Sequence, residues 1–111
     1  MCAEKTEPEN EIDVYQSRRF EKKFNSLNEA DRDAVDEQIE LIIKDPEIGE
    51  QKKGDLSFLR VHKFHLSNQL HLLGYSYVEE KLELYMLSMG THENFYSDQK
   101  QHRKADLKLI R

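Results

Sequence analysis

The hydrophobic pattern of the chain changes once along its length, and this change restricts the fold more than any other feature. Before Gly49, apolar side chains recur three and four residues apart, as on one face of an α-helix. They form two stripes, one of Phe20, Phe24 and Leu27 and one of Val35, Ile39, Ile42 and Ile43. After Gly54, short runs rich in Leu, Val, Phe and Tyr favour strands instead.

The first half is therefore predicted to form a pair of helices. Ser17 and Asn28 belong to the residue types that cap the amino ends of helices, so they mark the two starts. Asp45–Pro46 ends the second helix, because a residue before proline avoids the helical conformation. The link between the stripes is very short, which predicts two antiparallel helices.

The second half is predicted to form strands near residues 56–65, 69–77 and 82–89. The breaks between them are short and polar, which indicates hairpins and an antiparallel meander. A short run at Val14–Tyr15 could add a strand at its edge. The expected fold class is α+β, with an N-terminal helix pair packed on a small antiparallel sheet of three to four strands.

A length of 111 residues fits one domain. Residues 1–12 offer little apolar surface and are predicted to be a flexible acidic arm, which leaves 13–111 as a single domain. Its last stretch, Ser97–Arg111, is basic and allows a terminal helix. The lone cysteine, Cys2, has no partner for an internal disulfide and is interpreted as incidental.

The chain shows no sign of export or of membrane insertion. It has no apolar run near the roughly 20 residues that a membrane span needs. Its amino end also lacks the basic start and apolar stretch of a secretory signal. We therefore expect a cytoplasmic protein without a membrane partner.

The formal net charge of −5 hides an asymmetry. Residues 1–50 hold 15 acidic and 7 basic side chains, giving −8, whereas residues 51–111 hold 7 acidic and 10 basic ones, giving +3. The total argues against nucleic acid, since phosphate contacts need Lys and Arg. The basic second half could nevertheless present one face to an anionic partner, although a solvated acidic helix explains the first half equally well.

Strand alternation predicts which side chains share a face in the segment from Leu59 to Lys63. Leu59 and Val61 point one way and are expected to pack on the helices. Arg60 and His62 point the other way, onto an open face, where they suit either a binding role or a cationic strand that discourages edge pairing. His62 and His65 have opposite parity and cannot readily share an ion, so neither a metal nor another cofactor is expected.

A final motif carries a family resemblance. In the segment LYMLSMGTHENFY, the predicted strand ends at Gly90, so that Thr91, His92 and Tyr96 lie just beyond the sheet. This ending, after a helix pair and a hairpin, resembles the RelE/ParE superfamily of type II toxins, and most closely its YafQ-like and RelE-like mRNA interferases. The resemblance covers roughly residues 14–97.

The resemblance implies a site for each matching residue. His92 matches the catalytic histidine, Tyr96 the aromatic position near it, and Arg60 the strand cation that contacts phosphate. Either His62 or His65 takes the place of a further strand histidine. An acidic helper expected four positions later is absent, because Gln69 follows His65 at that spacing.

Basic residues near these positions are expected to contact RNA or the ribosome, namely Lys52, Lys53, Lys63, Arg103 and Lys104.

Two functions remain open at this stage. The first is a toxin that inhibits translation as a ribosome-dependent endoribonuclease, cleaving mRNA by metal-independent acid/base chemistry. The second is a ParE-like toxin that binds and inhibits DNA gyrase without nuclease activity. Both imply a cognate antitoxin protein as partner, and the fold alone does not separate them.

Overall fold

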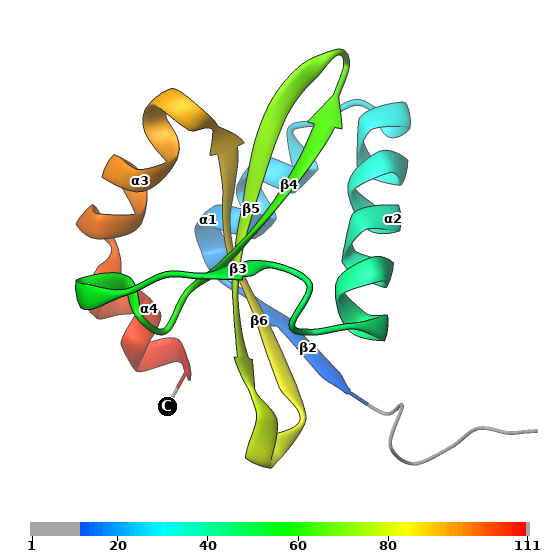
Figure 1. Ribbon diagram of the computed structural model, residues 1–111. Coiled ribbons are helices and arrows are strands. Elements are labelled where there is room, and N and C mark those ends of the chain that lie inside the picture. The colour runs from blue at the N-terminus through cyan, green and yellow to red at the C-terminus, as the bar shows by residue number, and fades with distance from the viewer. Residues whose placement is uncertain (1–11, 111) are drawn as a thin grey trace, which may run out of the picture.

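The computed structural model describes residues 12–110, in which helices cover both faces of one twisted sheet (Figure 1). In chain order the elements are β2 (Asp13–Gln16), α1 (Arg18–Asn25), α2 (Glu29–Lys44), β3 (Glu50–Gln51), β4 (Arg60–Leu66), β5 (Gln69–Val78), β6 (Glu83–Thr91), α3 (His92–Gln101) and α4 (Arg103–Ile110). Two short 3₁₀ turns, η2 (Gly54–Leu56) and η3 (Glu79–Lys81), interrupt the loops. The predicted acidic arm, apart from Ile12, and Cys2 lie outside the described residues.

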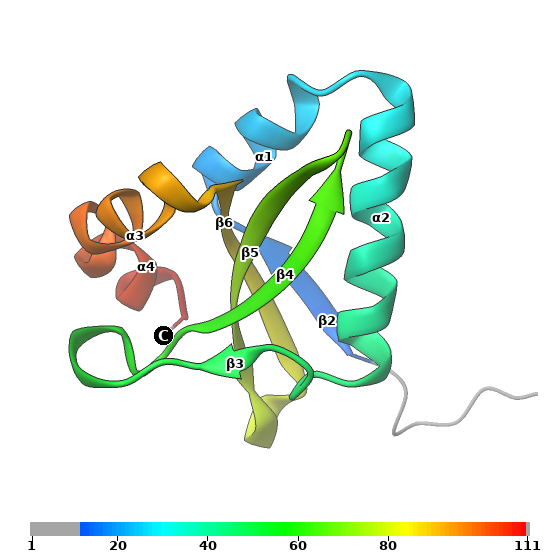
Figure 2. The same ribbon diagram turned by 45° about the horizontal axis from the view of Figure 1, so that its top comes forward.

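The predicted helix pair and its boundaries are confirmed. The Ser17 side chain accepts a hydrogen bond from the Phe20 backbone N–H, and the Asn28 side chain accepts one from that of Asp31. Each cap satisfies a backbone donor that the first helical turn leaves free. Asp45 closes α2. Figure 2 shows α1 rising to the turn and α2 returning beside the sheet.

The sheet has five strands in the order β2-β6-β5-β4-β3. The central meander of β4, β5 and β6 is antiparallel, as predicted. The strand expected at Val14–Tyr15 does join the edge, but it lies parallel to β6. The two-residue strand β3 was not predicted, because two residues carry no periodicity. Ser67 and Asn68, both with positive φ, make the tight turn between β4 and β5.

Two apolar clusters lie on opposite faces of the sheet. Under α1 and α2, buried side chains of both helices meet those of the strands, including Phe20, Val35, Ile42, Phe64 and Tyr75. The second cluster lies under α3 and includes Leu59, Val61, Leu72, Leu87 and Phe95. The expectation that Leu59 and Val61 pack on the helix pair is therefore wrong. The C-terminal helices supply a second layer whose apolar content is too sparse to indicate it from sequence.

Tyr75 fixes the loop between α2 and β3. Its buried hydroxyl donates to the Pro46 carbonyl oxygen at 2.7 Å and accepts from the Gly49 backbone N–H at 2.9 Å. A β-carbon at Gly49 would come within 2.9 Å of the Tyr75 ring, so glycine is what lets the loop approach so closely.

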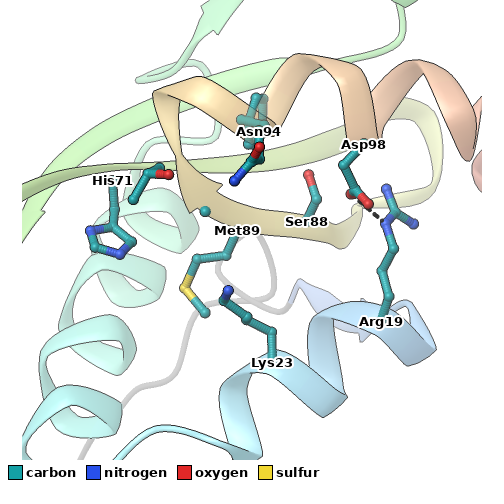
Figure 3. Close-up of a pocket in the computed structure, with 10 residues that line it drawn as sticks. Arg19, Lys23, His71, Ser88, Met89, Asn94 and Asp98 are labelled. Atoms are coloured by element: carbon teal, nitrogen blue, oxygen red, sulfur yellow. Dashed lines mark hydrogen bonds and ion pairs between the residues drawn. The ribbon is translucent and has the colours of Figure 1, made fainter.

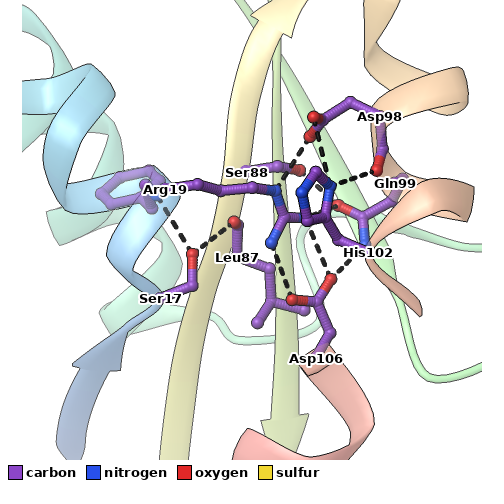
Figure 4. Close-up of polar contacts among 9 residues, drawn as sticks. Ser17, Arg19, Leu87, Ser88, Asp98, Gln99, His102 and Asp106 are labelled. Carbon is purple, nitrogen blue, oxygen red and sulfur yellow. Dashed lines mark hydrogen bonds and ion pairs between the residues drawn. The ribbon is translucent and has the colours of Figure 1, made fainter. Parts of the chain in front are cut away.

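A buried polar network ties the C-terminal helices to α1 (Figure 4). Arg19 of α1 donates to both carboxylate oxygens of Asp106 on α4, at 2.8 and 3.0 Å, and to Asp98 of α3 at 2.9 Å. Gln99 joins the network by donating to Asp106 at 2.8 Å and accepting from Ser88 of β6. Burial alone would lower the pKa of Arg19, but the hydrogen bonds and charges of Asp106 and Asp98 outweigh it and raise that pKa.

We predict that Asp106→Ala lowers the free energy of unfolding by about 3 kcal/mol, because it leaves the Arg19 charge half-buried with one partner fewer. The double variant Arg19→Met/Asp106→Leu removes both charges while keeping the volume, and should recover most of that loss. Urea denaturation of the three proteins measures both effects. A single variant within about 0.5 kcal/mol of the parent would contradict the expectation.

Candidate functional site

His92 and Tyr96 lie together where the last strand becomes a helix. β6 ends at Thr91 and α3 begins at His92, so the two side chains are four residues apart on one helical face. Their ring centroids are 5.8 Å apart with an interplanar angle of 75°. His92 is exposed, whereas Tyr96 is half-buried with its ring edge-on to that of Phe95. The buried Phe95 thereby fixes Tyr96, which in turn borders His92.

Lys52 brings a cation to the same place from a distant part of the chain. Its Nζ lies 5.3 Å from the centroid of the Tyr96 ring and 3.1 Å from a Glu50 carboxylate oxygen. The Lys52 backbone N–H donates to the Leu59 carbonyl oxygen at 2.9 Å, which holds the loop against the start of β4. The Tyr96 side chain, and after it Glu50, raise the pKa of Lys52. Lys52 is therefore charged at neutral pH.

Lys63 and His65 of β4 also belong to the face that α3 partly covers. They alternate with the side chains that pack under α2, and both are exposed. Lys63 pairs with Leu72, and Leu72 pairs with Gly90 of β6, so one row crosses the sheet towards the start of α3. A β-carbon at Gly90 would meet nothing within 4 Å. The last residue of this row, Gly90, has no side chain, so its backbone is left uncovered two residues before His92.

Arg60 and His62 lie on the other face, and the expectation that they stand on an open surface is wrong. The Arg60 guanidinium donates to the carbonyl oxygens of Glu47 and Gly49, at 3.2 and 2.8 Å. His62 Nε2 lies 2.7 Å from Gln38 Oε1 of α2. Once Leu59 and Val61 pack under α3, alternation turns Arg60 and His62 towards α2. The structure therefore brings together His92, Tyr96 and Lys52, but not Arg60 or His62.

The other predicted contact residues lie near the η2 turn and α4. Arg103 donates through Nε to the Asp55 carbonyl oxygen at 2.8 Å, and this bond joins α4 to the η2 turn. Lys53 and Lys104 are exposed. The basic segment expected after Ser97 is helical, but it is broken into α3 and α4 at His102.

A pocket of about 250 Å³ opens between α1 and α3, and no pattern in the sequence predicts it. Figure 3 shows Arg19 and Lys23 of α1 on one side, Asn94 and Asp98 of α3 on another, and His71 of β5 at its end. These residues come from three distant segments, so no motif connects them.

Two searches of the described residues bear on other kinds of site. None of the helices within residues 12–110 has a stretch long and apolar enough to cross a membrane. The same residues contain no group of three His, Cys, Asp or Glu side chains placed to hold a metal ion.

The chain is similar to known toxins in sequence pattern and in fold. Residues 14–100 match the model of a family described as the ParE-like toxin of type II bacterial toxin-antitoxin system. No curated protein matches the chain in sequence.

Solved structures share the fold at low sequence identity. A mutant of the E. coli toxin RelE in the free state has a TM-score of 0.65 at 19% identity, covering 82% of this chain and 96% of that one. The RelBE toxin-antitoxin complex of E. coli has a TM-score of 0.60 at 18% identity, covering 73% and 96%. The archaeal RelE-RelB complex of Pyrococcus horikoshii OT3 has 0.52 at 17%, covering 72% and 93%. The predicted fold class is confirmed.

We predict that His62 makes stability depend on pH. Burial lowers the pKa of its ring in the folded protein below the ordinary 6.5, so the unfolded chain binds the proton more tightly. The stability that the neutral ring contributes is present above pH 6.5 and is lost as the pH falls towards the lowered pKa. His62→Phe should show a smaller difference between its urea midpoints at about pH 7.5 and pH 5.5 than the parent does. Equal differences would exclude His62 as the source.

Proposed function

Because the chain belongs to the family of ParE-like toxins of type II bacterial toxin-antitoxin systems, we propose that it is a ribosome-dependent endoribonuclease that cleaves mRNA and so inhibits translation. The observation that carries this proposal is the exposed His92, held beside Tyr96 with the Lys52 ammonium over the Tyr96 ring. A surface that served only to bind a protein would have no need of this combination. The resemblance of the GTH ending to the mRNA interferases supports the same reading.

RNA cleavage of this kind needs two proton transfers and a cation. A base takes the proton of the 2′-hydroxyl, the 2′-oxygen forms a bond to phosphorus, and the bond from phosphorus to the 5′-oxygen breaks. An acid then gives a proton to the leaving 5′-oxygen. The products are a 2′,3′-cyclic phosphate and a 5′-hydroxyl, with no oxidant, reductant or cofactor consumed.

The residues on the α3 face suit these roles. His92 transfers a proton, because histidine is the side chain that most often acts as a general acid or base. His65, rather than His62, is the strand histidine on the same face, and it supplies the second proton-transfer group. Tyr96 stacks on a base, an interaction worth about 1–3 kcal/mol in single-strand binding.

Lysines take the place that the resemblance assigned to Arg60. The Arg60 guanidinium is engaged by carbonyl oxygens on the opposite face. We therefore assign the stabilisation of phosphate charge to Lys52 and Lys63, while Lys53, Arg103 and Lys104 contact the ribosome more peripherally.

A cognate antitoxin protein is the partner that membership of a type II system implies. Two of the structures that share the fold are toxin-antitoxin complexes, which supports this partner. With ribosomes and mRNA as its targets, the protein would act in the cytoplasm.

Inhibition of DNA gyrase is the second candidate, and the ParE-like description of the matching family favours it. Under this alternative, His92 and Tyr96 would be ordinary surface residues of a binding module. Purified protein added to programmed ribosomes, in parallel with a gyrase supercoiling assay, separates the two. Cut mRNA with unaffected gyrase supports the nuclease, and the reverse result supports the alternative.

We predict that His92→Gln slows mRNA cleavage by about 10²–10⁴-fold, the usual contribution of a positioned proton-transfer group. The side chain is exposed, so the free energy of unfolding should change by less than about 1 kcal/mol. Cleavage on programmed ribosomes, ribosome co-sedimentation and urea denaturation measure the three properties. A folded variant that cleaves or arrests growth as strongly as the parent would refute the nuclease mechanism.

We predict that Lys52→Met lowers the cleavage rate by about 10²-fold, because it removes a cation next to the reacting phosphate. Lys52→Arg keeps the charge and can still lie over the Tyr96 ring, and should retain most of the activity. The two variants are compared in single-turnover cleavage at saturating ribosome. Equal losses in both would mean that the shape of the lysine, and not its charge, is required.

A further inference from the structure

The second half of β6, which pairs with β5 on one side only, lines a pocket that the proposed reaction does not use. β2 pairs with β6 only from Glu83 to Met86, so within residues 12–110 no strand lies beside Leu87–Thr91 on the side away from β5. The pocket of about 250 Å³ occupies this edge, between α1 and α3 (Figure 3). Ser88, Met89 and Gly90 of β6 line it.

The charges around the pocket favour an anion. Lys23 lines it and makes no ion pair with any residue from 12 to 110. Arg19 lines it as well, from one turn earlier on α1. Asp98 is the one carboxylate among the lining residues. Its Oδ2 lies 2.9 Å from Arg19 Nε and its Oδ1 lies 3.3 Å from His102 Nδ1. Its charge is thus offset, whereas that of Lys23 is not.

Neutral polar groups complete the lining with hydrogen-bond donors. The Asn94 amide and the Thr91 hydroxyl border the cavity, whereas the His71 ring, which also lines it, already donates through Nδ1 to the Gln69 carbonyl oxygen at 3.1 Å. The Asn94 side chain points into the space above Met89 (Figure 3). Asn94, Thr91 and Lys23 thus offer three donor groups, which suit the oxygens of a phosphate group.

The pocket also adjoins the candidate site along the chain. Thr91 lines the pocket, and the next residue, His92, carries the ring that contacts Tyr96. A single strand of RNA whose base stacks on Tyr96 could therefore place a neighbouring phosphate in the pocket by passing around the start of α3.

We propose that this pocket binds a backbone phosphate of single-stranded RNA, on the strand that continues from the nucleotide held by His92 and Tyr96. The inference rests on the proposed function for its ligand, because RNA is the anion that the neighbouring site would bring. Lys23 supplies the uncompensated charge, and Asn94 orients the phosphate. The pocket would thus set the path of the RNA and not its chemistry.

The test compares Lys23→Gln with Lys22→Gln. Lys22 is the preceding residue of α1, carries the same charge, is exposed and does not line the pocket. The ligand is a fluorescent, 2′-O-methylated hexaribonucleotide, which cannot be cleaved, and binding is followed by fluorescence anisotropy at several salt concentrations.

The expected result is an increase of Kd of about fivefold for Lys23→Gln and none for Lys22→Gln. The slope of log K against log salt should become shallower by about 0.7 for Lys23→Gln alone, as one phosphate contact on a single strand predicts. Asn94→Ala should weaken binding without changing this slope.

Three outcomes would overturn the proposal: equal effects of the two lysine variants, no binding of the oligonucleotide by the parent, or Lys23-dependent binding of an oligoglutamate peptide instead of RNA. The last would assign the pocket to an acidic polypeptide. Failure of the proposed function can be told apart from failure of this proposal. A protein that binds the oligonucleotide through Lys23 but does not cleave mRNA would support the phosphate pocket and contradict the nuclease activity.

Discussion

The ion pair between Arg19 and Asp106 holds the second layer of this protein in place. The α3 and α4 helices carry few apolar side chains, so the burial of apolar surface alone does little to stabilise their packing on the sheet. Asp106 is buried, and a buried carboxylate is tolerated only when a charged partner and further hydrogen bonds compensate it. Arg19 supplies two of these bonds and Gln99 a third. Because Gln99 also accepts from Ser88, the same network fixes α3 on β6 and thereby sets the position of His92.

Once α3 covers part of one face, strand alternation divides the charged residues of β4 between two environments. Arg60 and His62 turn towards α2 and the loop after it, where carbonyl and amide oxygens bind them. Lys63 and His65 turn towards the start of α3 and stay exposed. The candidate site therefore draws its cations from Lys52 and Lys63, and an acidic protein presents a locally basic surface without a basic overall charge.

The proposed site and the proposed phosphate pocket share one junction, the passage from β6 into α3. Gly90 leaves its backbone bare there, and His92 begins the helix on the far side.

The sequence by itself determined the local structure, because helix caps, apolar periodicity and tight turns act over a few residues. The caps Ser17 and Asn28, the short polar breaks between the strands and the Gly90–His92 ending could be predicted for this reason. Only the tertiary structure decided which face each strand presents. The second helical layer that covers one of those faces is held by the Arg19–Asp106 pair, whose partners are 87 residues apart in the chain, and no local pattern predicts such a contact. Lys52 and Tyr96, and likewise Lys23 and Asn94, are also far apart in the sequence, so no local pattern predicts that they lie close together. Such side chains meet only when the whole sheet and its two helical layers are assembled.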